Sequence, residues 1–378
     1  MDRRQFLVSM AAASTLLALP SDHSRAATQK TLLVIELAGG NDGLNTFIPY
    51  QDPNYLRLRP TLGIQDGIPV TETVALHPSL ADWQPLLEQG KLAVIQNVGY
   101  PDPDLSHFRS KAIWQSGLLA SAANGWLARY LDSTQSQAQD AVFLGGEYPL
   151  ALMGDQTRYL HLAPQLLVKT DGPLGQALAE LYNSPTSHPL AERIRKTVLQ
   201  SQAAVQDLLS ERGQRGARQG YPQDPAGRLL SLGSRLVNTG AEVIYLTLSG
   251  WDTHTNQLAR HGRLLQTLGQ GLAALHQDLV EQGLEDQVLV MVQSEFGRRP
   301  AENGSQGTDH GTAGPVILMG AVRGGFYGGN PALDSLERGN LPYQIDFRSV
   351  YAEILQRWWQ ADPSSVLEVS PPPIGVLA

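Results

Sequence analysis

Runs of consecutive hydrophobic residues, each ended by glycine or by polar residues, recur along the chain and predict buried β-strands. The first lies within residues 30–40, KTLLVIELAGG, and stops abruptly at two glycines. Comparable runs occupy residues 91–100, 241–250, 286–294 and 315–320. Because these runs are apolar at consecutive rather than alternate positions, the strands are expected to be covered on both faces, as in a parallel sheet.

Helical patterns separate the predicted strands. One helix is expected to begin at Asp224 and Pro225, a good N-cap and first-turn pair, and to continue to Asn238. The other helices are predicted over residues 256–282 and 347–359 and at starts near residues 77 and 106. The alternation of strand and helix predicts an α/β domain with a mostly parallel sheet sandwiched between helices.

Residues 120–221 differ from this alternation. They are rich in Gln, Ser and Pro, and they include an amphipathic pattern over residues 190–209 that predicts a long helix. We interpret this region as a helical insertion on the same domain. The predicted organisation is therefore a single domain over residues 28–378, interrupted by the insertion at about residues 120–221.

The N-terminus has the layout of an export signal. Arg3 and Arg4 precede an apolar run over residues 6–19, and small residues follow at Ala26 and Ala27. The arginine pair followed by Gln-Phe-Leu resembles a twin-arginine signal; an ordinary secretory signal or an uncleaved anchor is the alternative. We predict a signal peptide over residues 1–27, the twin-arginine export machinery as a partner, and a periplasmic or otherwise exported protein. No transmembrane segment is predicted in the mature chain.

Charge and composition narrow the chemistry. The formal net charge of −8 argues against a nucleic acid partner, because binding to its phosphates requires basic patches. The chain has no cysteine, which excludes disulfides, thiolate metal sites and cysteine nucleophiles. A metal ion would have to be held by imidazole nitrogen and oxygen ligands, which suit zinc, manganese, magnesium or calcium.

Polar side chains of the kinds that hold metals follow four of the predicted strands. Ligands of open α/β sheets bind outside the carboxyl ends of the strands, so these side chains are expected to share one site. Carboxylates and imidazoles can fix a divalent ion, which lowers the pKa of a bound hydroxyl or water, so the set indicates metal-assisted hydrolysis. The strand ends supply Asn41 and Asp42, Ser106 and His107, Asp252 and His254, and Glu295 with His310 across a polar loop.

Each of these residues also has an ordinary structural explanation. Asp42 after two glycines is typical of a turn, and Ser106 is typical of a helix N-cap. The acid and imidazole after the third strand could cap the helix that follows them. Glu295 could form a surface ion pair with Arg298. Their joint occurrence at one predicted sheet edge is what favours a shared site.

The motifs, taken in order, resemble those of the DUF1501 family of exported proteins, whose function is not established. The resemblance covers nearly the whole chain after the signal, from the first predicted strand to the last predicted helix. It rests on the motifs LAGGNDGLN, SHFRSKAIWQSG, GWDTHTNQ, SEFGRRPAENGSQGTDHG and DFRSVYAEIL.

That family is similar, more distantly, to the alkaline phosphatase and sulfatase superfamily, which holds metals at the strand ends of an α/β sheet beside a nucleophile. The resemblance implies an alkaline-phosphatase-like fold and a divalent metal ion as cofactor, namely zinc, manganese or calcium. It implies Ser106 as the nucleophile. The metal ligands predicted in this way, with His254 added as a neighbouring imidazole, are Asp42, Asp252, His254, Glu295 and His310.

Two positions depart from the superfamily's pattern. Phe296 stands where a histidine would follow the acid, and Asn256 stands where a histidine would follow Asp252, so one metal site is expected rather than two. The implied function is an exported metal-dependent hydrolase whose substrate is a small anionic ester of phosphate or sulfate. The alternative is a non-catalytic cell-envelope binding or assembly protein that retains the fold with a degenerate metal site.

The predicted catalytic set is Ser106, His107 and Arg109. The metal is expected to activate Ser106, because a free serine hydroxyl is a weak nucleophile. His107 is expected to orient the loop or to contact the substrate, because adjacent helical residues point about 100° apart and cannot easily share one proton. Arg109, Arg298 and Arg299 are predicted to contact an anionic group, with packing or surface roles as the alternative.

Overall fold

The computed structural model describes residues 30–134, 141–157, 159–162, 188, 191–192, 195 and 220–377. The predicted export signal lies outside the described residues, as does most of the predicted insertion, including most of the helix predicted over residues 190–209. Within the described ranges, no helix combines the length and the apolar character needed to cross a membrane.

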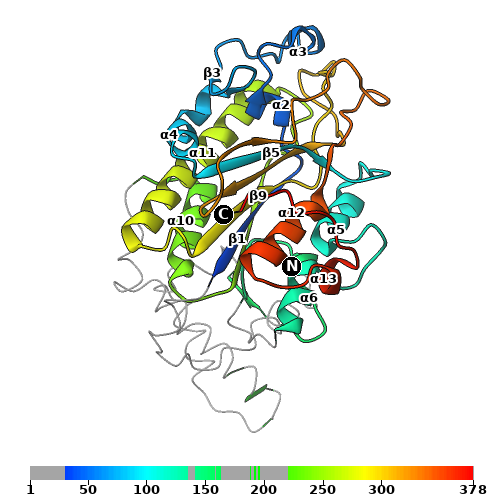
Figure 1. Cartoon of the computed structure of the whole chain (residues 1–378). Coiled ribbons are helices and arrows are strands. Elements are labelled where there is room, and N and C mark those ends of the chain that lie inside the picture. The colour runs from blue at the N-terminus through cyan, green and yellow to red at the C-terminus, as the bar shows by residue number, and fades with distance from the viewer. Residues whose placement is uncertain are drawn as a thin grey trace.

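A mixed, mainly parallel sheet runs through the centre of the described structure (Figure 1). In the described part of the chain, β10 is antiparallel to β5 and β9, and the other paired strands of this sheet are parallel. The predicted α/β fold with a mostly parallel sheet is confirmed. The strands in spatial order are β11 (Gly325–Tyr327), β5 (Leu92–Gly99), β10 (Gly314–Met319), β9 (Val288–Gln293), β1 (Thr31–Ala38), β8 (Val243–Ser249), β6 (Ala141–Leu144) and β7 (Leu160–His161), with β12 (Ile345–Asp346) paired to β5.

Helices cover both faces of this sheet (Figure 1). Alternate residues of β1 pack into two separate cores: Leu33 and Ile35 into one, Leu32 and Val34 into the other. A strand buried on both faces must be apolar at consecutive positions, which is the pattern that predicted it. One face carries η1 (Pro78–Trp83), α4 (Gln84–Glu88), α10 (Pro225–Val237) and α11 (Gln257–Gln282), and the other carries α5 (His107–Ser116), α6 (Trp126–Ser133), α12 (Phe347–Glu353), the π-helical η5 (Ile354–Trp358) and α13 (Ser364–Leu367).

Local sequence accounts for where the long helices begin and end. The Asp224 carboxylate accepts a backbone N–H of the first turn at 2.7 Å and Pro225 occupies that turn, so α10 starts where it was predicted. Helix α11 begins at Gln257 and ends before Gly283, whose left-handed φ of 68° is typical of a helix C-terminus. The helix predicted over residues 347–359 is α12 followed directly by η5.

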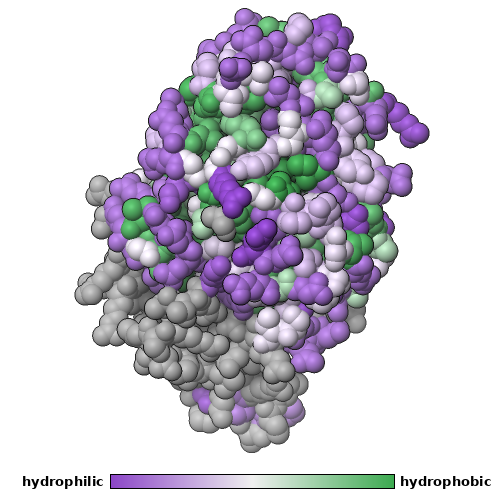
Figure 2. Space-filling model, viewed as in Figure 1, coloured by the Kyte–Doolittle hydropathy of each residue, from purple (hydrophilic) through white to green (hydrophobic). Residues whose placement is uncertain are grey.

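Short elements complete the described structure. Strands β6 and β7, which the hydrophobic pattern did not predict, come from the described part of the predicted insertion and extend the main sheet beside β8. The molecular face in Figure 2 is mostly hydrophilic, with hydrophobic residues in small groups among polar ones. The remaining elements are α2 (Gly43–Thr46), α3 (Pro53–Leu58), η3 (Leu150–Leu152) and a three-stranded sheet of β2 (Phe47–Ile48), β4 (Ala75–Leu76) and β3 (Ile68–Pro69).

Candidate metal centre

The carboxyl ends of β1, β5, β8 and β9 point toward the same edge of the sheet. Strands β8 and β9 run parallel to β1, and β10 is antiparallel to both β9 and β5, so β5 runs in the same direction as β9. The segments that follow these strands therefore converge, as the position of the polar motifs predicted.

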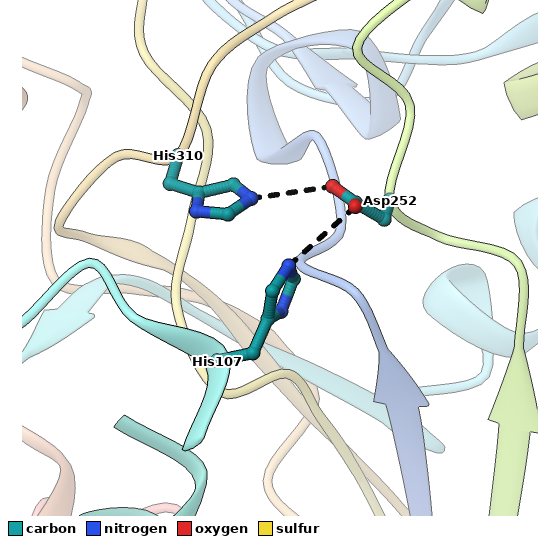
Figure 3. Close-up of side chains that lie close together, drawn as sticks. All are labelled: His107, Asp252 and His310. Atoms are coloured by element: carbon teal, nitrogen blue, oxygen red, sulfur yellow. Dashed lines mark hydrogen bonds and ion pairs between the residues drawn. The ribbon is translucent and has the colours of Figure 1, made fainter. Parts of the chain in front are cut away.

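His107, Asp252 and His310 form a compact group at this edge (Figure 3). They come from the start of α5, from the segment after β8 and from the loop before β10, and their ligand atoms all lie within 4.8 Å of one another. His107 Nε2 is 3.5 Å from Asp252 Oδ2, and His310 Nε2 is 3.2 Å from Asp252 Oδ1. Two imidazoles and a carboxylate at this spacing suit a divalent cation.

The second ring nitrogen of each histidine determines which nitrogen atom faces the centre of the group. His310 Nδ1 is 2.8 Å from the carbonyl oxygen of Leu105, which can only accept, so this nitrogen carries the hydrogen. His107 Nδ1 is 2.9 Å from Glu295 Oε1, an acceptor on a carboxylate. In the neutral rings both Nε2 atoms therefore hold lone pairs that point at Asp252. Lone pairs that face carboxylate oxygens repel them unless a proton or a cation lies between, and a divalent cation in that position would be held by all three side chains, so these residues fit a bound metal ion.

His254 extends the group toward solvent. Its Nε2 is 3.0 Å from His310 Nε2 and 3.1 Å from Asp252 Oδ1, and its Nδ1 is 3.3 Å from Asp309 Oδ1. The His254 side chain is 41% exposed. It therefore adds a third imidazole at the rim, where it could complete the coordination of an ion.

Glu295, a predicted ligand, is buried behind His107. Its two oxygens accept the backbone N–H of Gly39 at 2.9 and 3.1 Å, and Oε1 also accepts from His107. In this arrangement Glu295 orients the imidazole of His107 from the side opposite the centre. A carboxylate that holds the far nitrogen of a ligating histidine fixes its tautomer and ring orientation.

Asp42, also a predicted ligand, lies apart from the group. Its Oδ2 is 2.6 Å from Arg59 Nη1, both side chains are buried, and Gln257 donates to the same oxygen. Burial would raise the pKa of Asp42, but the charge and hydrogen bond of Arg59 hold that pKa below its ordinary value. Asp42 is thus an ionised partner of a buried arginine.

Charge at the group is set by neighbouring side chains. Burial would raise the pKa of Asp252, but the hydrogen bond and charge of Arg298, at 2.6 Å, lower it to about 2. The hydrogen bond to Glu295 raises the pKa of His107 above its ordinary value, whereas burial lowers the pKa of His310. Asp252 is therefore anionic at neutral pH and suited to bind a cation.

Arg298 and Phe296 shape the walls of the group. The buried guanidinium of Arg298 donates to the backbone carbonyls of Gly40 at 2.9 Å and Thr308 at 2.8 Å as well as to Asp252, so it ties strand ends together. The Phe296 ring packs against the imidazoles at centroid distances of 5.0 Å from His107 and 4.4 Å from His310. An apolar ring thus lies beside the cluster at the position where the superfamily pattern has histidine.

The other two members of the predicted catalytic set, Ser106 and Arg109, come from the start of α5. Ser106 is the exposed N-cap of α5, and its hydroxyl makes no capping hydrogen bond. Arg109 donates to Leu119 O and Ser121 Oγ, both at 2.9 Å, so its guanidinium is turned to the loop after α5. The structure thus places Ser106 next to His107 in the chain but does not bring Arg109 into the group.

One residue of the group, His107, and one residue beside it, Asp309, have roles that the sequence motifs do not assign. His107 was expected to orient the loop or to contact substrate, and the structure places it among the candidate ligands. The sequence feature that could have identified His107 as a ligand is its position after a predicted strand, beside Ser106. Asp309, whose carboxylate meets His254, directly precedes His310 in the loop motif, and that adjacency is its only local signal.

The chain matches a protein family and is similar in fold to solved structures. Residues 90–368, more than half of the chain, match the family described as "Protein of unknown function (DUF1501)". A comparison with curated proteins found no match.

The described fold is similar to solved structures of the alkaline phosphatase superfamily. A superfamily protein from Vibrio parahaemolyticus is 10% identical, with 86% of this chain and 71% of that chain covered and a TM-score of 0.34. Alkaline phosphatase from the Antarctic bacterium TAB5 is 11% identical, with 79% of this chain and 95% of that chain covered and a TM-score of 0.34. The C-terminal periplasmic domain of EcEptC from Escherichia coli, in complex with Zn, is 10% identical, with 80% of this chain and 77% of that chain covered and a TM-score of 0.36. Because each TM-score is below 0.5, the chemistry of this site has to be deduced from its own side chains.

Proposed function

The chain belongs to the DUF1501 family, and from the geometry of its own side chains we propose that it is an exported hydrolase of phosphate or sulfate esters that depends on a divalent metal ion. The observation that carries the proposal is the convergence of His107, Asp252 and His310, with both imidazole Nε2 atoms aimed at one carboxylate. A cation between these acceptors accounts for their arrangement.

His107, Asp252 and His310 would hold the metal, with His254 as a neighbour at the rim. A bound divalent cation lowers the pKa of a hydroxyl or water beside it, which is what ester hydrolysis requires. Glu295 keeps the hydrogen of His107 on Nδ1 and thereby leaves the Nε2 lone pair for the cation. Imidazole ligands suit zinc or manganese better than calcium, which prefers oxygen.

Ser106 is the proposed nucleophile. It directly precedes His107, its side chain is exposed, and its hydroxyl is not used to cap α5. The N-terminal end of α5 carries partial positive charge from its unpaired N–H groups, which favours an anionic ester beside Ser106. Arg109 bonds the following loop, so the proposal assigns it no contact with the ester.

Metal binding to purified, chelator-treated protein tests the centre. Zn²⁺ or Mn²⁺ at about 100 times its Kd should raise the free energy of unfolding by about 2.7 kcal/mol. His310→Gln should weaken binding by roughly 100-fold or more, because it removes a ligand rather than an outer partner. His161→Gln is the matched control. His161 lies on β7 at the far edge of the sheet, and its Nε2 is 2.8 Å from the carbonyl oxygen of Gly145. Equal metal affinity in the two variants would contradict the assignment.

Hydrolysis of 4-nitrophenyl phosphate and 4-nitrophenyl sulfate tests the activity. Ser106→Ala should lower turnover by roughly 10³-fold or more while metal content stays unchanged. Full turnover in this variant would assign the attack to water instead. If the metal-loaded wild-type protein hydrolysed neither ester, the non-catalytic binding or assembly role would be the better explanation of the same metal centre.

A further inference from the structure

Beside the proposed metal centre, one buried amide joins the two chain segments that carry Asp252 and His310. Gln257, the first residue of α11, is fully buried. Its Oε1 accepts from Thr253 Oγ1 at 3.0 Å and from Thr308 Oγ1 at 2.7 Å. Thr253 directly follows Asp252, and Thr308 lies two residues before His310. A single acceptor atom thus holds one hydroxyl from each segment.

The other end of the same amide is also fixed. Gln257 Nε2 donates to Asp42 Oδ2, the oxygen that Arg59 Nη1 meets at 2.6 Å. Arg59 in turn donates to the carbonyl oxygens of Arg299 at 3.0 Å and Pro300 at 2.7 Å, in the loop between β9 and β10. Because the ionised Asp42 carboxylate can only accept, Nε2 of the amide must face Asp42, and its Oε1 must face the two threonine hydroxyls.

The backbone also links the two segments. Asn256 N donates to Ser305 O at 3.1 Å, Gln257 N to Gln306 O at 2.8 Å, and Thr308 N to Thr253 O at 3.3 Å. The bond nearest to Asp252 and His310, from Thr308 to Thr253, is the longest of the three and lies at the long end of the range for a backbone hydrogen bond. The two threonine hydroxyls and Gln257 have no exposed surface, so neither hydroxyl can exchange its bond for one to bulk water. A buried polar group left unpaired destabilises the folded protein, which opposes any separation of the two segments.

We propose that Gln257 is a positioning residue that sets the spacing between Asp252 and His310, two ligands of the proposed metal ion. The inference rests on the proposed function and deepens it. It gives Asp42 a role other than that of a ligand, since Asp42 anchors the amide that holds the ligand-bearing segments. A merely structural Gln257 would affect stability and leave the metal centre unchanged, so the test has to separate these two effects.

The test uses Co²⁺ as the probe and threonine variants that keep the buried volume. Thr253→Val and Thr308→Val each remove one hydroxyl from Gln257, and each should weaken Co²⁺ binding by roughly 10- to 100-fold and change the visible spectrum of the bound ion. Thr308→Ser retains the hydroxyl and should restore both. Thr31→Val is the matched control, because Thr31 Oγ1 makes an equally buried bond to Ala241 O at 2.7 Å near the opposite end of β1. It should lose comparable stability and bind Co²⁺ as the wild-type protein does.

The outcomes distinguish this inference from the proposed function. Wild-type Co²⁺ affinity and spectrum in both Thr253→Val and Thr308→Val would overturn the positioning role. If the wild-type protein itself binds no Co²⁺, the proposed metal centre fails, and the positioning role is then measured by imidazole ¹⁵N spectra of the metal-free protein. Thr308→Val should shift the nitrogen signals of His310 and leave those of His161 in place. Unchanged His310 signals would overturn the inference without reference to any metal.

Discussion

Gly39 is the residue on which the close approach of the strand ends depends. Its φ of 123° is a backbone conformation that residues with a side chain rarely adopt. A Cβ at this position would lie 2.2 Å from the backbone nitrogen of Asp252. The Gly39 N–H also binds both oxygens of Glu295, which orients His107. One glycine therefore allows β1 to approach two of the segments that build the candidate metal centre.

Replacement of this glycine should damage both the fold and the centre. Gly39→Ala should lower the free energy of unfolding by roughly 3 kcal/mol or more, because the backbone must move as well as adopt an unfavourable φ. Gly283 offers a matched comparison: its φ is also positive, at 68°, but a Cβ there meets nothing within 4 Å. Gly283→Ala should cost only about 1 kcal/mol and leave Zn²⁺ binding intact. Denaturant unfolding and Zn²⁺ titration measure both effects, and equal losses in the two variants would contradict this account.

Helix α5 meets the sheet through polar as well as apolar side chains. His107, Lys111 and Gln115 follow one another at intervals of four residues, so they lie along one helix face, which we call the polar seam. His107 bonds Glu295, Lys111 Nζ is 3.7 Å from Glu36 Oε1, and Gln115 Nε2 donates to both Glu36 oxygens at 3.1 and 3.0 Å. These bonds fix the rotation of α5 about its axis and thereby the direction of the His107 imidazole.

The polar seam predicts a pH dependence of stability through Glu36. Burial raises the pKa of the Glu36 carboxyl above its ordinary value of 4.5, although Lys111 opposes the rise. The folded protein therefore keeps a proton that the unfolded chain has lost, so the contribution of Glu36 to stability is fully present below about pH 4.5 and is lost as the pH rises through the folded pKa. Glu36→Gln has no titrating group at this position. Relative to metal-free wild-type protein, its free energy of unfolding should increase as the pH rises above 4.5.

Glu302→Gln supplies a control with the opposite sign. Burial opposes the shift, but the backbone N–H groups of Leu62 and Thr61 hold the pKa of Glu302 below its ordinary value. The stability that Glu302 contributes is therefore present above the unfolded pKa and lost as the pH falls, so this variant should become less stable than the wild-type protein as the pH rises. Unfolding curves between about pH 3 and pH 8 measure how the stability of each variant, relative to the wild-type protein, changes with pH. If the stabilities of the two variants, relative to the wild-type protein, changed in the same direction with pH, the Glu36 carboxyl would not be the source of the pH dependence.

The candidate metal centre forms only when the whole sheet is assembled. Its candidate ligands come from the start of α5, the segment after β8 and the loop before β10, which are separated by long stretches of chain. No single segment supplies more than part of the group. A metal ion bound by the folded chain would therefore stabilise the entire arrangement.

This dependence on complete folding agrees with the proposed export route. A twin-arginine system carries folded proteins, so a metal ion could be inserted before export. Replacing Arg3 and Arg4 by lysine should trap the precursor in the cytoplasm, because this route recognises the arginine pair. Fractionation of cells that produce the wild-type and doubly substituted chains measures the effect. Normal export of the double variant would indicate the general secretory route.

Consecutive hydrophobic residues were sufficient to predict the main strands, because burial on both faces is a requirement that each strand meets along its own length. Strands β1, β5, β8 and β9 begin and end within about two residues of the predicted runs. The positions of His107, Asp252 and His310 at strand exits likewise followed from the order of elements. The antiparallel direction of β10 did not, since an apolar run has the same pattern in either direction.

Only the tertiary structure decided which polar groups face the centre. Asp42 and Glu295 look like ligands in the sequence as much as Asp252 does, yet Asp42 pairs with buried Arg59 and Glu295 accepts hydrogen bonds from Gly39 and His107. Gln257 has no local sign of its role, because its partners come from three segments. The physical reason is that a buried carboxylate or amide takes whichever partner the folded chain brings within hydrogen-bonding distance, and residues distant in sequence supply those partners.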